Sequence, residues 1–177
     1  RIGDEFNIQY LFKTAGDSYR HADLIKETGA TLIVPIDFPE APKVDDTLTA
    51  DEVSFEDLKH WELAPFNAPI LAENDIPFAI TSSGAKADFW TNLRKAVKNG
   101  LPQNQAIDAM TRIPANALGL TEIVGQLTPS ALANFIVTTK PLFTEGSIIL
   151  ENWIQGERYV INSSYDDREG VYELVIE

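Results

Sequence analysis

The sequence predicts an α/β fold that continues into a small all-β region. Helix-like and strand-like segments alternate from residue 12 to about residue 125. Two uncharged runs, 31–34 and 78–81, stand between helical segments, as is typical of strands in a parallel sheet with both faces buried. After Gly125 only strand-like segments remain, so the chain is expected to change architecture there.

The first helix is predicted to begin at Asp17 or Ser18, because either side chain can cap a helix N-terminus. Gly29 suits the left-handed residue that often ends a helix. The buried strand 31–34 follows directly and ends at Pro35.

Residues 37–51 contain two prolines, Pro39 and Pro42, among many acids, and they are predicted to form a long exposed loop. Ser54 and Asp57 have the spacing of a capping box, which predicts a short helix after this loop. The acidic loop lacks the spacing of a calcium-binding loop, so its charges are expected to be solvated.

Further elements follow from the same signals. Residues 82–86 are predicted to form a loop of small residues, and the apolar face of residues 88–99 predicts a helix. Pro102 can open the next helix, where its missing N–H costs nothing. The remaining predictions are a helical turn over 114–118, strands over 135–137, 148–154 and 158–161, a hairpin turn at Gln155-Gly156 and a last strand over 171–176.

Composition excludes several classes of function. The chain has 177 residues and a formal net charge of −13, with no basic run, so neither nucleic acid nor an acidic membrane surface is expected as a partner. Without cysteine there is no thiolate metal site, and two histidines leave little room for a histidine-rich one. No run approaches the roughly 20 apolar residues of a membrane-spanning helix, and no targeting segment is found. A start at Arg1, with Met110 as the single methionine, is expected of an excerpt from a longer protein.

Residues 106–160 carry a recognisable pattern. The segments AIDAMTRIPANALGLTEIVGQL, TPSALANFIVT and ENWIQGERYVI resemble the C-terminal segment of the metal-dependent amidohydrolase family, especially its imidazolonepropionase-like branch. TAGDSYRHADLIKETGATLIVP and FAITSSG resemble the last strand–helix units of that family's (β/α)₈ barrel. The resemblance implies hydrolysis of a C–N bond, commonly in a cyclic amide, by a metal-activated water.

The same resemblance identifies candidate site residues at the ends of the barrel strands. Thr14, Asp37 and Ser82 or Ser83 stand where the family places two histidines and an aspartate that hold metal. Hydroxyl groups are poor zinc ligands, so no cofactor is expected for this segment. Zinc or another divalent metal is implied for the intact protein if it is active.

Each candidate also has a purely structural interpretation. Asp37 can cap a turn instead of binding a ligand, and Ser82-Ser83-Gly84 can be a plain strand-to-helix connection. Ser82 and Ser83 lack the histidine and the Gly-x-Ser-x-Gly pattern of a serine nucleophile. His21 and His60 are expected to pack or face solvent rather than bind metal.

The predicted organisation is a partial amidohydrolase-like barrel over residues 1–125, β-sandwich strands over 126–161, and a linker with a first strand of a further domain over 162–177. The predicted function is hydrolysis of C–N bonds other than peptide bonds, with a small-molecule substrate. The alternative is a catalytically degenerate module that binds a ligand or scaffolds a larger hydrolase. Because part of a barrel exposes strand edges, the chain is expected to self-associate or to pack against other parts of the parent protein.

Overall fold

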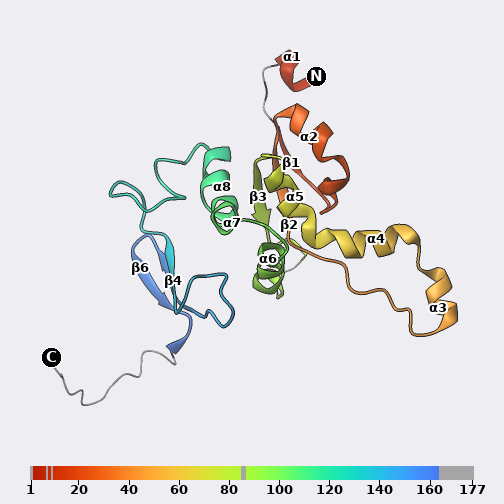
Figure 1. Ribbon diagram of the computed structural model, residues 1–177. Helices are drawn as coiled ribbons and strands as arrows, with labels where there is room; N and C mark the ends of the chain where they lie inside the picture. The colour runs from red at the N-terminus through yellow and green to blue at the C-terminus, as the bar shows by residue number, and fades with distance from the viewer. Residues whose placement is uncertain (1, 7, 9, 85–86, 164–177) are drawn as a thin grey trace. The chain divides into compact units, whose positions relative to one another are not determined.

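A computed structural model of the chain describes residues 2–6, 8, 10–84 and 87–163 (Figure 1). The chain divides into two compact units, residues 1–126 and residues 127–177. The first unit contains a parallel three-stranded sheet with helices, and the second contains an antiparallel three-stranded sheet. The mixed α/β class predicted from the sequence is therefore confirmed.

The first unit is built from strands that alternate with helices. Its parallel sheet has the order β1-β2-β3. The strands are β1 (Leu11–Lys13), β2 (Thr31–Pro35) and β3 (Phe78–Thr81). The helical elements are α1 (Ile2–Phe6), η1 (Ser18–His21), α2 (Ala22–Thr28), α3 (Thr47–Glu52), α4 (Phe55–Leu63), η2 (Ala64–Phe66), α5 (Asn67–Glu73), α6 (Phe89–Lys98), α7 (Gln103–Met110) and α8 (Arg112–Ala117).

Most local signals in the sequence produce the expected element. Gly29 adopts the left-handed conformation at the end of α2, with φ of 62°. The Ser54 hydroxyl accepts a hydrogen bond from the Asp57 backbone N–H at the start of α4. Pro102 is the N-cap of α7, one residue before the first helical position at which it was expected.

Three expectations for the first unit are wrong. Neither Asp17 nor Ser18 caps α2 through its side chain, because η1 stands between them and the start of α2 at Ala22. The segment 37–51 is not one continuous loop, because its last residues form α3. Strand β2 is not buried on both faces: Leu32 and Val34 are buried, whereas Thr31, Ile33 and Pro35 are only half-buried. The alternation follows from the pleat of the strand, which leaves one face of this sheet partly open.

The buried face of the sheet forms the core with its covering helices. Leu71 of α5, Leu93 and Ala96 of α6 and Ala106 of α7 are buried together with Val34 of the sheet. Element η1 is fixed to the neighbouring helices by polar contacts. These are the Tyr19 backbone N–H to Asn67 Oδ1 at 2.8 Å, the Tyr19 hydroxyl to His60 Nδ1 at 3.0 Å, and an ion pair of Arg20 with Glu56.

The second unit contains β4 (Phe135–Thr138), β5 (Ile149–Ile154) and β6 (Glu157–Val160), paired antiparallel in that order. The predicted hairpin joins β5 to β6 through Gln155 and Gly156, both with positive φ, as a tight hairpin turn requires. The strand predicted over 171–176 lies outside the described residues. No helix in the described part of the chain has the length and apolarity to cross a membrane.

Candidate functional site

The three parallel strands end at one edge of the sheet. Lys13 of β1 is aligned with Ile33 of β2, and Pro35 of β2 is aligned with Thr81 of β3. The residues that follow each strand therefore come to the same edge. These include the four predicted site residues Thr14, Asp37, Ser82 and Ser83.

Lys13 and Ser83 connect the two outer strands of this sheet. The Lys13 ammonium donates a hydrogen bond to the Ser83 hydroxyl, with an Nζ–Oγ distance of 3.1 Å. Since Lys13 is aligned with Ile33, its side chain leaves the sheet on the half-open face and crosses the end of β2. The loop that carries Ser83 is turned by a second hydrogen bond, from the Ser83 backbone N–H to Thr81 Oγ1 at 3.3 Å.

Asp37 lies against the same loop. Gly84 has φ of +94°, and a Cβ atom at this position would overlap the Asp37 carboxylate. The backbone just before Asp37 is held by α6, because Asn92 Nδ2 donates to the Ile36 carbonyl at 3.1 Å. Lys13, Ser83, Gly84 and Asp37 thus form a continuous group, which we call the edge cluster.

Thr14 is not part of the edge cluster. Its hydroxyl oxygen is buried and has no hydrogen-bond partner among the described residues. Its backbone N–H continues the sheet by donating to the Ile33 carbonyl at 3.0 Å. Thr14 follows Lys13 directly, and its buried oxygen contrasts with the exposed side chain of that lysine.

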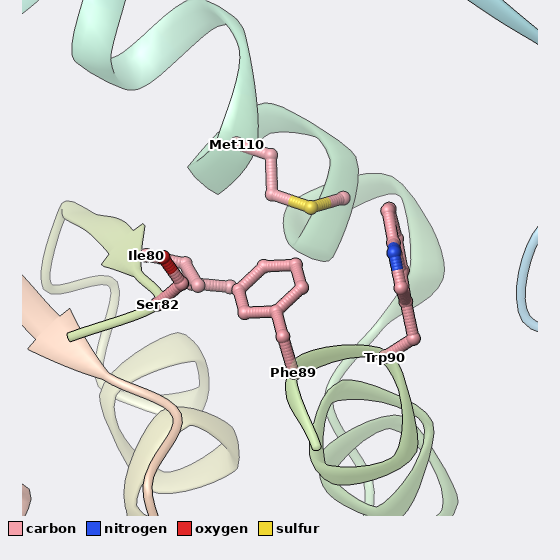
Figure 2. A pocket seen from close by; sticks show the side chains of 5 residues that line it. All are labelled: Ile80, Ser82, Phe89, Trp90 and Met110. Atoms are coloured by element: carbon pink, nitrogen blue, oxygen red, sulfur yellow. The ribbon is translucent and has the colours of Figure 1, made fainter. Parts of the chain in front are cut away.

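Ser82 lines a pocket of its own. The pocket has a volume of about 420 Å³, and its other lining residues are Ile80, Phe89, Trp90 and Met110. Figure 2 shows the Phe89 ring pointing toward the strand end that carries Ile80 and Ser82, with Met110 and Trp90 on its other side. Phe89 and Trp90 pack edge to face with ring centroids 5.2 Å apart. The volume is within the range of small-molecule sites, and the lining side chains are apolar except for the Ser82 hydroxyl and the Trp90 indole N–H.

The groups at the strand ends do not fit a divalent metal. Within the described residues, no three histidine, cysteine, aspartate or glutamate side chains lie close enough together to hold an ion. Thr14, Ser82 and Ser83 offer only hydroxyl oxygens, which are poor zinc ligands, and Asp37 is the one carboxylate among the four predicted site residues. The Lys13 ammonium beside Ser83 adds a positive charge where a cation would be bound.

The two histidines lie away from the edge cluster. His60 stacks on Tyr19 with ring centroids 6.1 Å apart and shares a hydrogen bond with its hydroxyl. His21 is exposed at the end of η1. The structure thus places His60 in a packed helix contact and His21 at the surface.

Lys13 was not among the site residues predicted from the sequence. Thr14 was aligned with a family ligand, and the preceding lysine was given no role. The signal that could have identified Lys13 is the strand pleat: it is the last residue of its strand, and its side chain must lie on the face opposite to that of Phe12.

A family model described as the amidohydrolase family matches residues 18–159. The structure resembles an amidohydrolase from Thermotoga maritima MSB8, with a TM-score of 0.63 and 16% sequence identity, covering 89% of this chain and 38% of that one. It also resembles a prolidase complexed with N-methylphosphonate-L-proline, with a TM-score of 0.58 and 13% identity, covering 89% of this chain and 46% of that one.

A Xaa-Pro dipeptidase with bound methionine gives a TM-score of 0.57 and 13% identity, again covering 89% of this chain and 46% of the other. At these identities the likeness concerns the fold alone. The chain spans less than half the length of each of these three structures. No curated protein sequence matches the chain.

Proposed function

The chain belongs to the amidohydrolase family, and from this premise we propose that it supplies part of the substrate-binding wall of a hydrolase acting on C–N bonds other than peptide bonds. In this proposal β1, β2 and β3 are the last strands of a (β/α)₈ barrel, and β4 to β6 belong to a small β-sandwich. The parallel order of the first sheet and the fold likeness support this assignment. The resemblance of residues 106–160 to the imidazolonepropionase-like branch supports a small amide as substrate.

The observation that carries the proposal is the hydrogen bond between Lys13 and Ser83. It brings the ends of the two outer strands together across β2, with Asp37 against the same loop. In barrel enzymes the reacting groups come from the C-terminal ends of the strands and the loops that follow. The edge cluster therefore stands where such a barrel would contact its substrate.

The cluster can hold an amide by complementary hydrogen bonds. Asp37 is an acceptor for an amide N–H, and the Lys13 ammonium and the Ser83 hydroxyl are donors for an oxygen. Because the strand-end groups do not fit a metal ion, we assign them to binding and orientation and not to activation of water. The remaining strands of the barrel would have to come from residues outside 18–159, the region that matches the family model.

The test is hydrolysis by the full-length protein of a panel of cyclic amides, N-acyl amino acids and Xaa-Pro dipeptides. We expect turnover of a cyclic or acyl amide, and we expect Lys13→Met to lower kcat/KM about tenfold through a higher KM, since it removes a charged hydrogen bond. The control is Lys26→Met, which removes the same charge from the exposed surface of α2. Turnover of the dipeptides alone would contradict the proposed bond class.

The second candidate function is a catalytically degenerate module that binds a ligand or scaffolds a neighbouring active domain. The observation that favours it is the strand-end chemistry, in which Asp37 is accompanied by hydroxyl groups and an ammonium instead of metal ligands. Amide binding to the edge cluster without turnover by the full-length protein would support this candidate and contradict the first.

A further inference from the structure

Two donor groups of the edge cluster, the Lys13 ammonium and the Ser83 hydroxyl, lie next to each other. The Lys13 ammonium has three N–H donors and no acceptor, and one of them is directed at Ser83 Oγ. Because that oxygen accepts from Lys13, the Ser83 hydroxyl proton remains available for another acceptor. A positive charge and a hydroxyl donor 3.1 Å apart suit one group with two acceptor oxygens, such as a carboxylate.

The acceptor of the edge cluster is held beside these donors. Asp37 contacts Gly84, the residue after Ser83, so its carboxylate lies against the loop that carries Ser83. The Asn92 bond to the Ile36 carbonyl fixes the backbone that carries Asp37. An anionic ligand alone would be repelled by this carboxylate, whereas a ligand with an N–H donor beside its anionic group would be bound by both.

We propose that the edge cluster binds a small molecule that carries a carboxylate together with an N–H group, as an N-acyl amino acid does. Lys13 and Ser83 bind the carboxylate, and Asp37 accepts the N–H. This assignment rests on the proposed function in one respect, which is that the ligand is taken to be a substrate. Binding of the ligand can be measured without turnover. It also makes the end of this sheet an anion site where the family resemblance implies a cation site.

Three probes separate the two contacts, and each is added to the full 177-residue chain in solution. N-acetyl-L-alanine has both groups, N-acetyl-L-alaninamide lacks the carboxylate, and N-acetyl-L-proline lacks the N–H. Binding is followed by the shifts of the backbone amide signals of Lys13, Ser83 and Gly84 in nuclear magnetic resonance spectra. We expect N-acetyl-L-alanine to bind about tenfold more tightly than either of the other probes.

Two substitutions assign each preference to a residue. Lys13→Met is expected to remove the preference for the carboxylate probe over its amide, and Asp37→Asn to remove the preference over the proline probe. Lys26→Met and Glu27→Gln, which make the same charge changes on α2, are expected to leave both preferences unchanged. The spectra of each variant also report whether it is folded.

Several results would overturn the assignment. It fails if no probe shifts these signals at millimolar concentration, or if the folded Lys13→Met variant keeps the carboxylate preference. Zinc chloride that binds the wild-type chain stoichiometrically and loses its site in Asp37→Asn would show a cation site instead. A different result would contradict the hydrolase proposal alone. In that case the probes would bind with the expected preferences, but the full-length protein would show no turnover.

Discussion

The parallel sheet of residues 1–126 and the antiparallel sheet of residues 127–163 place their side chains very differently. Among the described residues, every buried hydrophobic side chain belongs to the first unit, including Val34, Leu71 and Leu93. In the second unit the buried residue is Ser147, and the strand residues of β4, β5 and β6 are half-buried or exposed.

The second sheet depends instead on pairs of side chains across its strands. Phe135 and Trp153 are aligned on neighbouring strands and stack with ring centroids 5.4 Å apart. Arg158 forms an ion pair with Glu151 at 2.6 Å, and the Trp153 indole N–H donates to the same carboxylate. Burial beneath helices thus stabilises one sheet and cross-strand contacts stabilise the other, so the two are expected to respond to different perturbations.

The largest expected effect is in the helix-covered core. Leu93→Ala should lower the free energy of unfolding of the first unit by about 3 kcal/mol, because it leaves a cavity at a fully buried position. Trp153→Ala, the matched change in the second unit, should cost about 1 kcal/mol through loss of ring stacking. Urea unfolding followed by amide hydrogen exchange measures both. Equal loss of protection throughout the chain in either variant would show that the two units unfold as one.

An intermediate effect is expected at the edges of the parallel sheet. In the described part of the chain, β1 and β3 each pair with β2 alone, and Phe12 is 49% exposed on the outer strand. We propose that these edges make the chain self-associate or pack against other parts of the parent protein. Phe12→Lys should weaken self-association about tenfold, since a charged side chain opposes pairing of strand edges.

Light scattering at micromolar concentration measures this association. Leu24→Lys is the control, because it introduces the same charge at an exposed apolar position on α2. A single sharp monomer peak for the unmodified chain would contradict the proposal.

The smallest effect is expected in the hairpin of the second sheet. The hydrogen bond from Arg158, and then that from Trp153, holds the pKa of Glu151 below its usual value of 4.5. Because the pKa is lower in the folded state, this contact stabilises β5 and β6 above pH 4.5 and is lost as the pH falls through the folded pKa. Protection factors of the hairpin amides should therefore decrease on acidification.

Glu151→Gln should flatten this pH dependence, while Glu145→Gln, at an exposed carboxylate of the same unit, should leave it unchanged. An acid response that persists in Glu151→Gln would place its origin elsewhere.

Local signals in the sequence were sufficient for most of the fold. Ser54 and Gly29 act through contacts within a few residues, so the cap at each helix end can be recognised without tertiary structure. The uncharged run of β2 predicted a strand buried on both faces, and this prediction was wrong because Ile33 and Pro35 lie on a partly open face. The prediction of a loop over 37–51 was also wrong, because acidic residues and nearby prolines indicated a loop where the short helix α3 forms.

The site was harder to predict, since it depends on which faces of the strands meet. Placing Asp37 and Ser83 at strand ends was enough to bring them to one edge. Lys13 joins Ser83 through a contact between residues 70 positions apart. The strand pleat can indicate the face on which the Lys13 side chain lies, but it does not identify Ser83 as the partner. Ser82, next to Ser83 in sequence, lines a separate pocket, a division that the sequence does not show.

The absence of a side chain at Gly84 links two distant positions of the chain. Any substitution there would have to displace the carboxylate of Asp37, besides adopting a φ of +94° that side chains disfavour. A substitution at Gly84 therefore requires a change at Asp37, whereas Asp37 can change while Gly84 is kept. A homologue with a larger residue at the position of Gly84 is expected to have lost the carboxylate at the position of Asp37, and with it the N–H contact of the edge cluster.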